Sequence, residues 1–242
     1  MKATLTLILL LSCSLTFAAQ TVTVMPLASE PHHRLCLHNE YVNVYQVQVA
    51  PHDSVLLHRH DFDAISVMLS DAQVTVNTPG RPGVHRRLTA GQIRLQSRGY
   101  VHATNVDGDT TYRNVTVELL LPQEREHNLC SEVIPDKPLN CPAAQATGPR
   151  TSNDQFHFES DQTSVNLIPV LPHQTIAIGH PTYPELVVAL DPDLTTGAKT
   201  EHLRKSFNSG EFLWVGGGKA PVLVNNNGNK KSQIVVFTFR PH

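Results

Sequence analysis

Downstream of residue 20 the chain consists of short apolar runs separated by clusters of Gly, Pro, Asn and Asp. The runs are rich in Val, Ile, Phe and Thr, which favour β-strands, and no segment has the 3.6-residue period of an amphipathic helix. The clearest runs are residues 41–49, 71–78, 114–121, 186–191, 210–216 and 232–239. The pattern predicts an all-β protein built from many short strands.

The composition fits a loop-rich globular protein. Of the 242 residues, 40% are hydrophobic and 17% charged, and 17 Pro and 13 Gly supply turns. At roughly 100 to 200 residues per domain, the length allows two domains. The least strand-like region, residues 123–163, is rich in Pro, Ala and Thr, so we expect the domain boundary near residue 150, between domains 21–150 and 151–242.

An internal repeat supports this division. "PHDSVLL" from Pro51 resembles "PHQTIAI" from Pro172, an offset of 172 − 51 = 121. "GQIRLQSRG" from Gly91 corresponds to "GEFLWVGGG" from Gly210, an offset of 210 − 91 = 119. One change in loop length explains the difference. Solenoid repeats are typically about 20 to 50 residues long, so this repeat predicts two copies of one β domain.

Residues 1–20, "MKATLTLILLLSCSLTFAAQ", have the features of a secretory signal peptide. One Lys precedes an apolar run, and small residues follow at Ala18 and Ala19. The run is shorter than the roughly 20 residues that span a bilayer, so no membrane span is expected. The sequence predicts a secreted or periplasmic protein, with lipoprotein attachment at Cys13 as the alternative.

Export changes the interpretation of the cysteines, because thiols outside the cytosol tend to pair. Cys130 and Cys141 flank a polar loop with two prolines, and this short separation favours a local disulfide. Cys36 is then left over. Its apolar neighbours predict a small buried residue rather than a reactive thiol.

The formal charge of −2, from 19 Lys and Arg against 21 Asp and Glu, provides no basic surplus for a phosphate backbone. Small molecules or proteins are therefore the expected partners, and nucleic acid is not. The oligomeric state stays open, a homo-oligomer included.

Three histidines form the candidate site. His58 and His60, in "HRHDFDAISVML", are two residues apart, and on a strand such residues face the same side about 6 to 7 Å from each other. With 14 His in the chain, about one such pair is expected by chance, so the pair alone is weak evidence for a metal site. A third candidate, His102, lies in "GQIRLQSRGYVHATN".

The glycine frame around His102 resembles the second motif of the cupin superfamily, G-x5-P-x-G-x2-H-x3-N. Gly91, Gly99 and His102 match it in register. Ser97 replaces the Pro, and Val106 stands where Asn is usual.

The first cupin motif, G-x5-H-x-H-x(3,4)-E-x6-G, is matched by His58 and His60. Its Glu is absent, and Ala64 and Ile65 occupy the two slots. The resemblance covers almost all of the chain after residue 20 and implies a two-domain cupin, a bicupin, built from two antiparallel jelly-roll barrels.

The second half keeps the scaffold without the ligands. Gly179 and Pro181 fall where the first pair of histidines lies, and Pro221 replaces the third histidine. Glu185 falls at the slot of Ala64. We therefore expect the second copy to bind no metal.

The resemblance makes His58, His60 and His102 the metal ligands. Three histidines leave coordination positions open, as catalytic metal sites do. Fe, Mn, Ni, Cu and Zn all suit such a set as divalent ions, and a relic site without metal stays an alternative. Asp63 is either a fourth ligand or a turn residue outside the site.

Two further residues are candidates for binding a substrate. In "TYRNVTVELL", Arg113 shares a strand face with Val115 and Val117. That apolar face is expected to point into the barrel, with Arg113 at its mouth, where a guanidinium binds a carboxylate or reaches into water. Tyr100 shares its parity with His102 and is expected to line the same cavity.

The sequence lacks a nucleophile elbow, a Cys and His dyad, a phosphate loop and paired carboxylates at usable spacing, so any chemistry must use the metal. The leading hypothesis is a metal-dependent enzyme of oxygenase or isomerase type acting on a small organic molecule. The alternative is a non-catalytic protein that binds a sugar or similar ligand, with a structural or vestigial metal site. Whether the protein is an enzyme stays open.

Overall fold

The computed structural model describes residues 23–123, 126–128, 132–133, 155–198 and 205–240. Within these residues the regular structure is β-strand, apart from one 3-10 turn at Leu27–Ser29. The prediction of an all-β fold is confirmed. The predicted signal peptide, the boundary near residue 150 and the pair Cys130 and Cys141 lie outside the described residues.

Two sheets form the first barrel. The five-stranded sheet has the order β1 (Met25–Pro26), β4 (Ser54–Arg59), β9 (Val101–Val106), β6 (Ala72–Asn77) and β7 (Val84–Leu88). The six-stranded sheet has the order β12 (Glu132–Val133), β8 (Ile93–Gln96), β5 (Asp63–Met68), β10 (Tyr112–Leu119), β3 (Val42–Val49) and β2 (His33–His38).

Two further sheets form the second barrel. The six-stranded sheet has the order β11 (Glu126–Asn128), β13 (Gln155–Ser160), β14 (Thr163–Val170), β21 (Ser232–Phe239), β16 (Glu185–Ala189) and β19 (Phe212–Val215). The four-stranded sheet has the order β15 (Thr175–Ile178), β20 (Val222–Asn226), β17 (Leu194–Ala198) and β18 (Lys205–Phe207).

The strand pairing repeats between the two halves with the offsets found in the sequence. Ile65 pairs with Leu95 in the first barrel, and Leu186 pairs with Trp214 in the second. The offsets are 186 − 65 = 121 and 214 − 95 = 119. The order β8-β5-β10-β3-β2 therefore corresponds to β19-β16-β21-β14-β13, and the chain contains two copies of one jelly-roll barrel.

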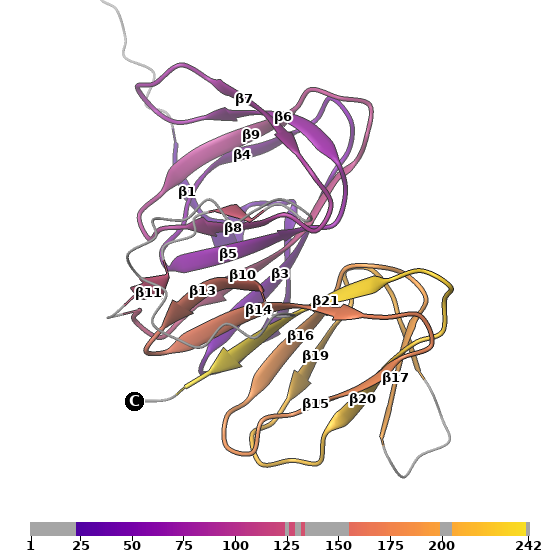
Figure 1. The fold of residues 1–242 in the computed structure, drawn as a ribbon. Helices are drawn as coiled ribbons and strands as arrows, with labels where there is room; N and C mark the ends of the chain where they lie inside the picture. Colours follow the sequence, from indigo (N-terminus) through magenta and orange to yellow (C-terminus); the bar gives the residue numbers. More distant parts are fainter. Residues whose placement is uncertain (1–22, 124–125, 129–131, 134–154, 199–204, 241–242) are drawn as a thin grey trace, which may run out of the picture.

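The largest core lies between the two barrels. The four sheets are stacked, and the two six-stranded sheets face each other in the middle of the stack (Figure 1). Val115 and Val117 of β10 pack in one cluster with Leu186 and Phe237 of the second barrel, and all four are fully buried. Burying such a side chain stabilises the fold by about 1.5 to 3 kcal/mol.

This core corrects the predicted orientation of β10. The face with Val115 and Val117 points to the second barrel, and Asn114 and Thr116 on the opposite face line the interior of the first barrel. Both faces of β10 are buried. Its apolar side chains lie on the face that meets the apolar sheet of the second barrel. The polar side chains surround the histidines.

The prediction that Cys36 is buried is also wrong. It lies on β2, the edge strand of its sheet, and its side chain is exposed. Among the described residues, no helix has the length and apolar character needed to cross a membrane.

Candidate metal site

Two neighbouring strands bring the three histidines together. His58 on β4 pairs directly with His102 on β9 in the antiparallel ladder. His60 follows the end of β4, and its N–H donates to the carbonyl of Tyr100 at 2.9 Å. The N–H of Gly99 donates to the carbonyl of His60 at 2.8 Å. Gly99 has a left-handed conformation (φ 82°), which a glycine adopts without strain.

The imidazoles converge on one point. One nitrogen from each of the three histidines lies within 4.8 Å of the other two. The Nε2 atoms of His60 and His102 are 3.1 Å apart. Two nitrogens bound to one ion at about 2.1 Å lie roughly 3.0 to 3.4 Å apart, so this separation fits a shared metal. The side chains of His58, His60 and His102 are buried.

The hydrogen bonds of His58 suit a metal ligand. Its Nδ1 lies 2.8 Å from the carbonyl oxygen of Leu56, which can only accept, so Nδ1 carries the proton. Nε2 is then an unprotonated donor to an ion, and it is buried with no hydrogen-bond partner among the described residues. Metal-bound histidines usually donate their second N–H in this way. The residues present therefore fit a divalent ion.

Burial keeps the three rings neutral. Burial, together with the neighbouring His58 and His33, lowers the pKa of His60 to about 3. Burial also lowers the pKa values of His58 and His102. Neutral imidazole is the form that binds metal, so the triad is ready for an ion at neutral pH.

A fourth histidine, held by a buried carboxylate, lines the same cavity. The Nδ1 of His33 lies 2.7 Å from Oε2 of Glu30, and the ring centroid of His33 is 5.0 Å from that of His58. Burial would raise the pKa of Glu30, but hydrogen bonds from His33, His32 and the N–H of Leu56 outweigh it and lower the pKa to about 2. The ionised carboxylate therefore fixes the proton of His33 on Nδ1.

Sequence reasoning missed Glu30 and His33. They precede the first histidine pair by more than twenty residues and belong to neither motif. The pair of histidines just after an acidic residue, in "EPHHR", was the available signal.

Polar side chains complete the cavity. The hydroxyl of Ser66 lies 3.0 Å from both Gln96 Oε1 and Thr116 Oγ1, and Thr116 donates to Asn114 Oδ1 at 2.8 Å. The cavity has a volume of about 10 Å³. This is room for one ion or about one water molecule, far below the roughly 300 to 1,000 Å³ of a typical ligand pocket.

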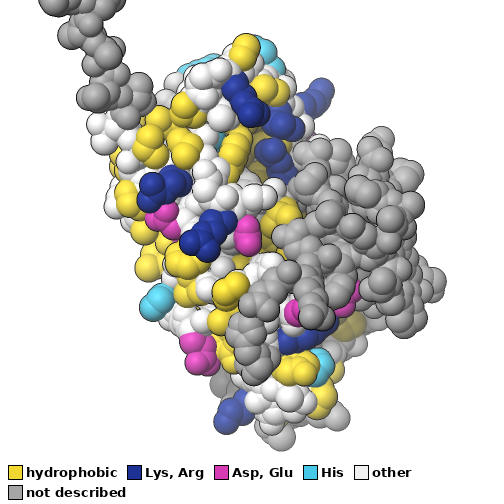
Figure 2. Space-filling view, turned by 90° about the vertical axis from the view of Figure 1, so that its left-hand side faces the viewer, with side chains coloured by type: hydrophobic (Ala, Val, Ile, Leu, Met, Phe, Trp, Pro, Cys, Tyr) yellow, Lys and Arg dark blue, Asp and Glu magenta, His cyan; other side chains and the backbone are white. Residues whose placement is uncertain are grey.

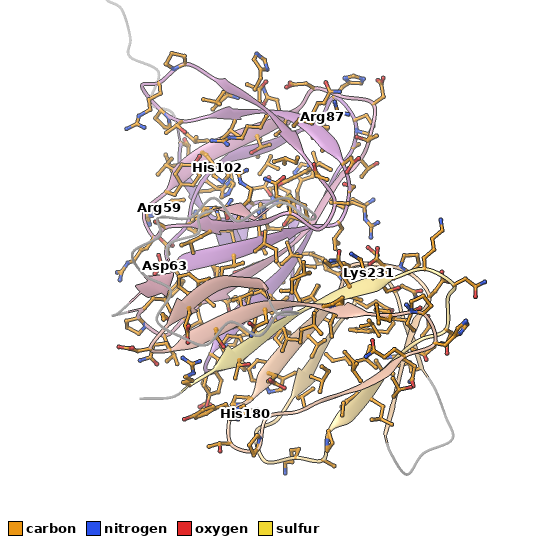
Figure 3. The ribbon with its side chains drawn as sticks, in the orientation of Figure 1. Arg59, Asp63, Arg87, His102, His180 and Lys231 are labelled. Carbon is orange, nitrogen blue, oxygen red and sulfur yellow. The ribbon has the colours of Figure 1, made fainter. Side chains whose placement is uncertain are left out.

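The other predicted residues lie in different places. Tyr100 lies against His102, with ring centroids 4.6 Å apart and ring planes tilted by 30°, but it lines a separate cavity with Arg86 and not the histidine cavity that was expected. Asp63 accepts the N–H of Arg98 at 2.8 Å and is not part of the histidine cluster. Figure 3 shows Asp63 on a different layer of the barrel from His102. The position predicted for Arg113 is wrong: it lines a cavity with Gly210 at the junction of the barrels, because its strand face points away from the histidines.

The second barrel lacks the ligands at the equivalent place. Ile178 pairs with Val222, and a Cβ on the adjacent Gly179 would lie 3.0 Å from the Cα of Pro221. Glu185 is buried and accepts a hydrogen bond from Thr238 at 3.1 Å. Among the described residues, the triad of the first barrel is the one group of metal-ligating side chains found.

The surface carries both signs of charge. On the face shown in Figure 2, Lys and Arg side chains lie in separate small groups between apolar, acidic and uncharged side chains.

No protein-family model and no curated protein matches the sequence. Solved structures do match the fold. AerE from Microcystis aeruginosa has a TM-score of 0.56 at 10% identity, over 88% of this chain and 99% of that one. A cupin 2 conserved barrel domain protein from Leptotrichia buccalis has a TM-score of 0.53 at 8% identity, over 86% and 88%.

A third similar structure is the salicylate 1,2-dioxygenase from Pseudoaminobacter salicylatoxidans as an adduct with gentisate. Its TM-score is 0.57 at 9% identity, over 83% of this chain and 68% of that one. At these identities the likeness concerns the fold. The chain has the cupin fold, as two tandem barrels, and the fold that the sequence motifs implied is confirmed.

Proposed function

We propose that the protein is a metal-dependent enzyme of oxygenase or isomerase type that acts on a small organic molecule in the first barrel. The observation that carries the proposal is the convergence of three buried, neutral imidazoles, each with one nitrogen available to a common ion. Three protein ligands leave coordination positions open. A dioxygenase with a bound aromatic acid among the similar structures supports this class.

His58, His60 and His102 would hold the ion, which supplies a Lewis acid with open positions. Glu30 orients the ring of His33 through its Nδ1, so Nε2 is the ring nitrogen left for a group at the cavity wall. The ring of Tyr100 lies against that of His102. Burial of the triad excludes bulk water from the site.

A second function is favoured by the size of the cavity. About 10 Å³ beside the histidines accommodates an ion but no organic substrate. A protein in which the metal is structural and a small ligand binds elsewhere would have such a closed site. An enzyme needs the cavity walls to move before a substrate reaches the ion.

The test is turnover by the metal-loaded protein. The chain is purified without chelator and loaded separately with Fe(II), Mn(II), Ni(II), Cu(II) and Zn(II). Oxygen consumption and product formation are then measured against a panel of small carboxylates and phenols. Activity that is lost in both His58→Ala and His102→Ala but kept in His85→Gln, an exposed histidine, supports the enzyme. Full metal loading without turnover of any compound supports the binding protein.

We also propose that the protein is exported, as supported by residues 1–20. Mass spectrometry of the protein from its native source should find a mature chain that begins near residues 19 to 21. An intact N-terminus would contradict export by this route.

A further inference from the structure

A second cavity, of about 440 Å³, lies at the junction of the two barrels. Its volume falls within the roughly 300 to 1,000 Å³ of small-molecule sites. Arg34 of β2 and Arg113 of β10 line it from the first barrel, and Gly210 lines it from the second. We propose that this junction cavity binds a small organic anion that carries carboxylate or phosphate groups.

The strand ladder places the polar groups on one face. Arg34 lies opposite Gln46, and Arg113 lies opposite Gln48. Side chains directly opposite each other in an antiparallel pair share a face, so two guanidinium groups and two amides surround the same space. The apolar core of the same face begins next to them at Val115. In Figure 1, β3 and β10 lie beside the layer of the second barrel.

The charges in the junction cavity favour an anion. The described lining includes two arginines and no Asp or Glu. Among the described residues, the hydrogen bonds of both arginines go to neutral oxygens: Arg34 donates to the side-chain amide of Gln46, and Arg113 donates to the carbonyl of Ser209. Each guanidinium has five N–H donors, most of which stay available. Arginine binds carboxylate and phosphate groups with two parallel hydrogen bonds.

The turn of the second barrel that closes the cavity is held in place. Nε2 of Gln46 donates to the carbonyl of Gly210 at 2.9 Å, and the N–H of Gly210 donates to Ala189 at 2.9 Å. Gly210 has φ 86°, and a Cβ there would lie 2.6 Å from Leu69 Cδ1. A wall fixed by both barrels reduces the entropy lost when a ligand binds.

The junction cavity is distinct from the histidine cavity. Asn114 lines both, and the remaining lining residues differ. Its Oδ1 accepts a hydrogen bond from Thr116 inside the histidine cavity. An anion in the junction cavity is therefore separated from the triad by this side chain, and its binding does not require the metal ligands.

Calorimetric titration of the full chain tests the proposal, with succinate as the carboxylate probe and inorganic phosphate as the second probe at a constant ionic strength of about 150 mM. We expect one anion per chain for at least one probe. Arg34→Gln and Arg113→Gln should each weaken binding at least about tenfold, as the loss of a charged hydrogen bond of about 1.5 to 3 kcal/mol predicts. Arg87→Gln, on the outer sheet of the first barrel in Figure 3, should bind as the wild type does.

The stronger of the two probes identifies the oxyanion. Arg34 is exposed on an edge strand, so its variant keeps the fold even if Arg113→Gln does not, and thermal unfolding checks this. Absence of saturable binding by both probes would overturn the proposal. Equal binding by folded Arg34→Gln would do so as well. Loss of binding in His58→Ala would place the anion on the triad and would also refute it.

Discussion

The buried imidazole of His60 makes the metal-free protein sensitive to acid in a predictable way. Its pKa falls from 6.5 to about 3 on folding, chiefly through burial. Between pH 6.5 and pH 3 the unfolded chain therefore binds a proton at this ring and the folded chain does not. The contribution of the neutral ring to the free energy of unfolding is therefore complete above pH 6.5 and is lost as the pH falls. A pH of 4 lies 2.5 units below the pKa of the ring in the unfolded chain. At about 1.4 kcal/mol per unit, the loss is about 3 kcal/mol relative to pH 7.

Urea unfolding of chelator-treated protein at pH 7 and pH 4 measures this loss. His60→Gln removes the titrating group, so its free energy of unfolding should fall by about 3 kcal/mol less than that of the wild type. Titration of other groups contributes to both proteins. His85→Gln is the matched control, because the side chain of His85 is 85% exposed, and it should follow the wild type. If His60→Gln lost as much stability as the wild type, the assignment of a buried neutral imidazole would be refuted.

Two further predictions concern the fold and the thiols. Phe237→Ala opens the core between the barrels, where the side chain is fully buried, and should lower the free energy of unfolding by about 3 to 5 kcal/mol, whereas Leu171→Ala, at 54% exposure, should change it by less than about 0.5 kcal/mol. Similar losses in both would contradict the packing. Thiol titration of the denatured, unreduced mature chain should count Cys36 alone, because Cys130 and Cys141 are predicted to pair; three thiols would exclude the disulfide.

The sequence predicted the strands and the convergence of the triad because both depend on local periodicity. The positions of His58 and His102 depend on the alternation of side chains along a strand and on a glycine turn, and both are encoded by residues close to them in the sequence. The fold of the second half followed from the repeat, whose offsets reappear in the pairing of Leu186 with Trp214.

The errors arose where the environment of a side chain depends on distant parts of the chain. The face of β10 was inverted because an apolar row, including Val117, does not tell which of two buried surfaces it contacts. The predicted position of Arg113 was wrong for the same reason, because Arg113 lies on that face. Cys36 has apolar neighbours but lies on an edge strand, where burial depends on what covers it. His33 joins the cavity through β2 and the carboxylate of Glu30, an association that no motif spacing encodes.

Occupation of the histidine cavity by a metal is the central claim. Anaerobic titration of the full chain with Fe(II) and Zn(II), combined with X-ray absorption of the loaded protein, tests it most directly. We predict one ion per chain bound by three imidazole nitrogens at about 2.0 to 2.2 Å, with affinity at least about 100-fold lower in His58→Ala, His60→Ala and His102→Ala. A wild type that binds neither ion, or three variants that bind as tightly as the wild type, would contradict the claim.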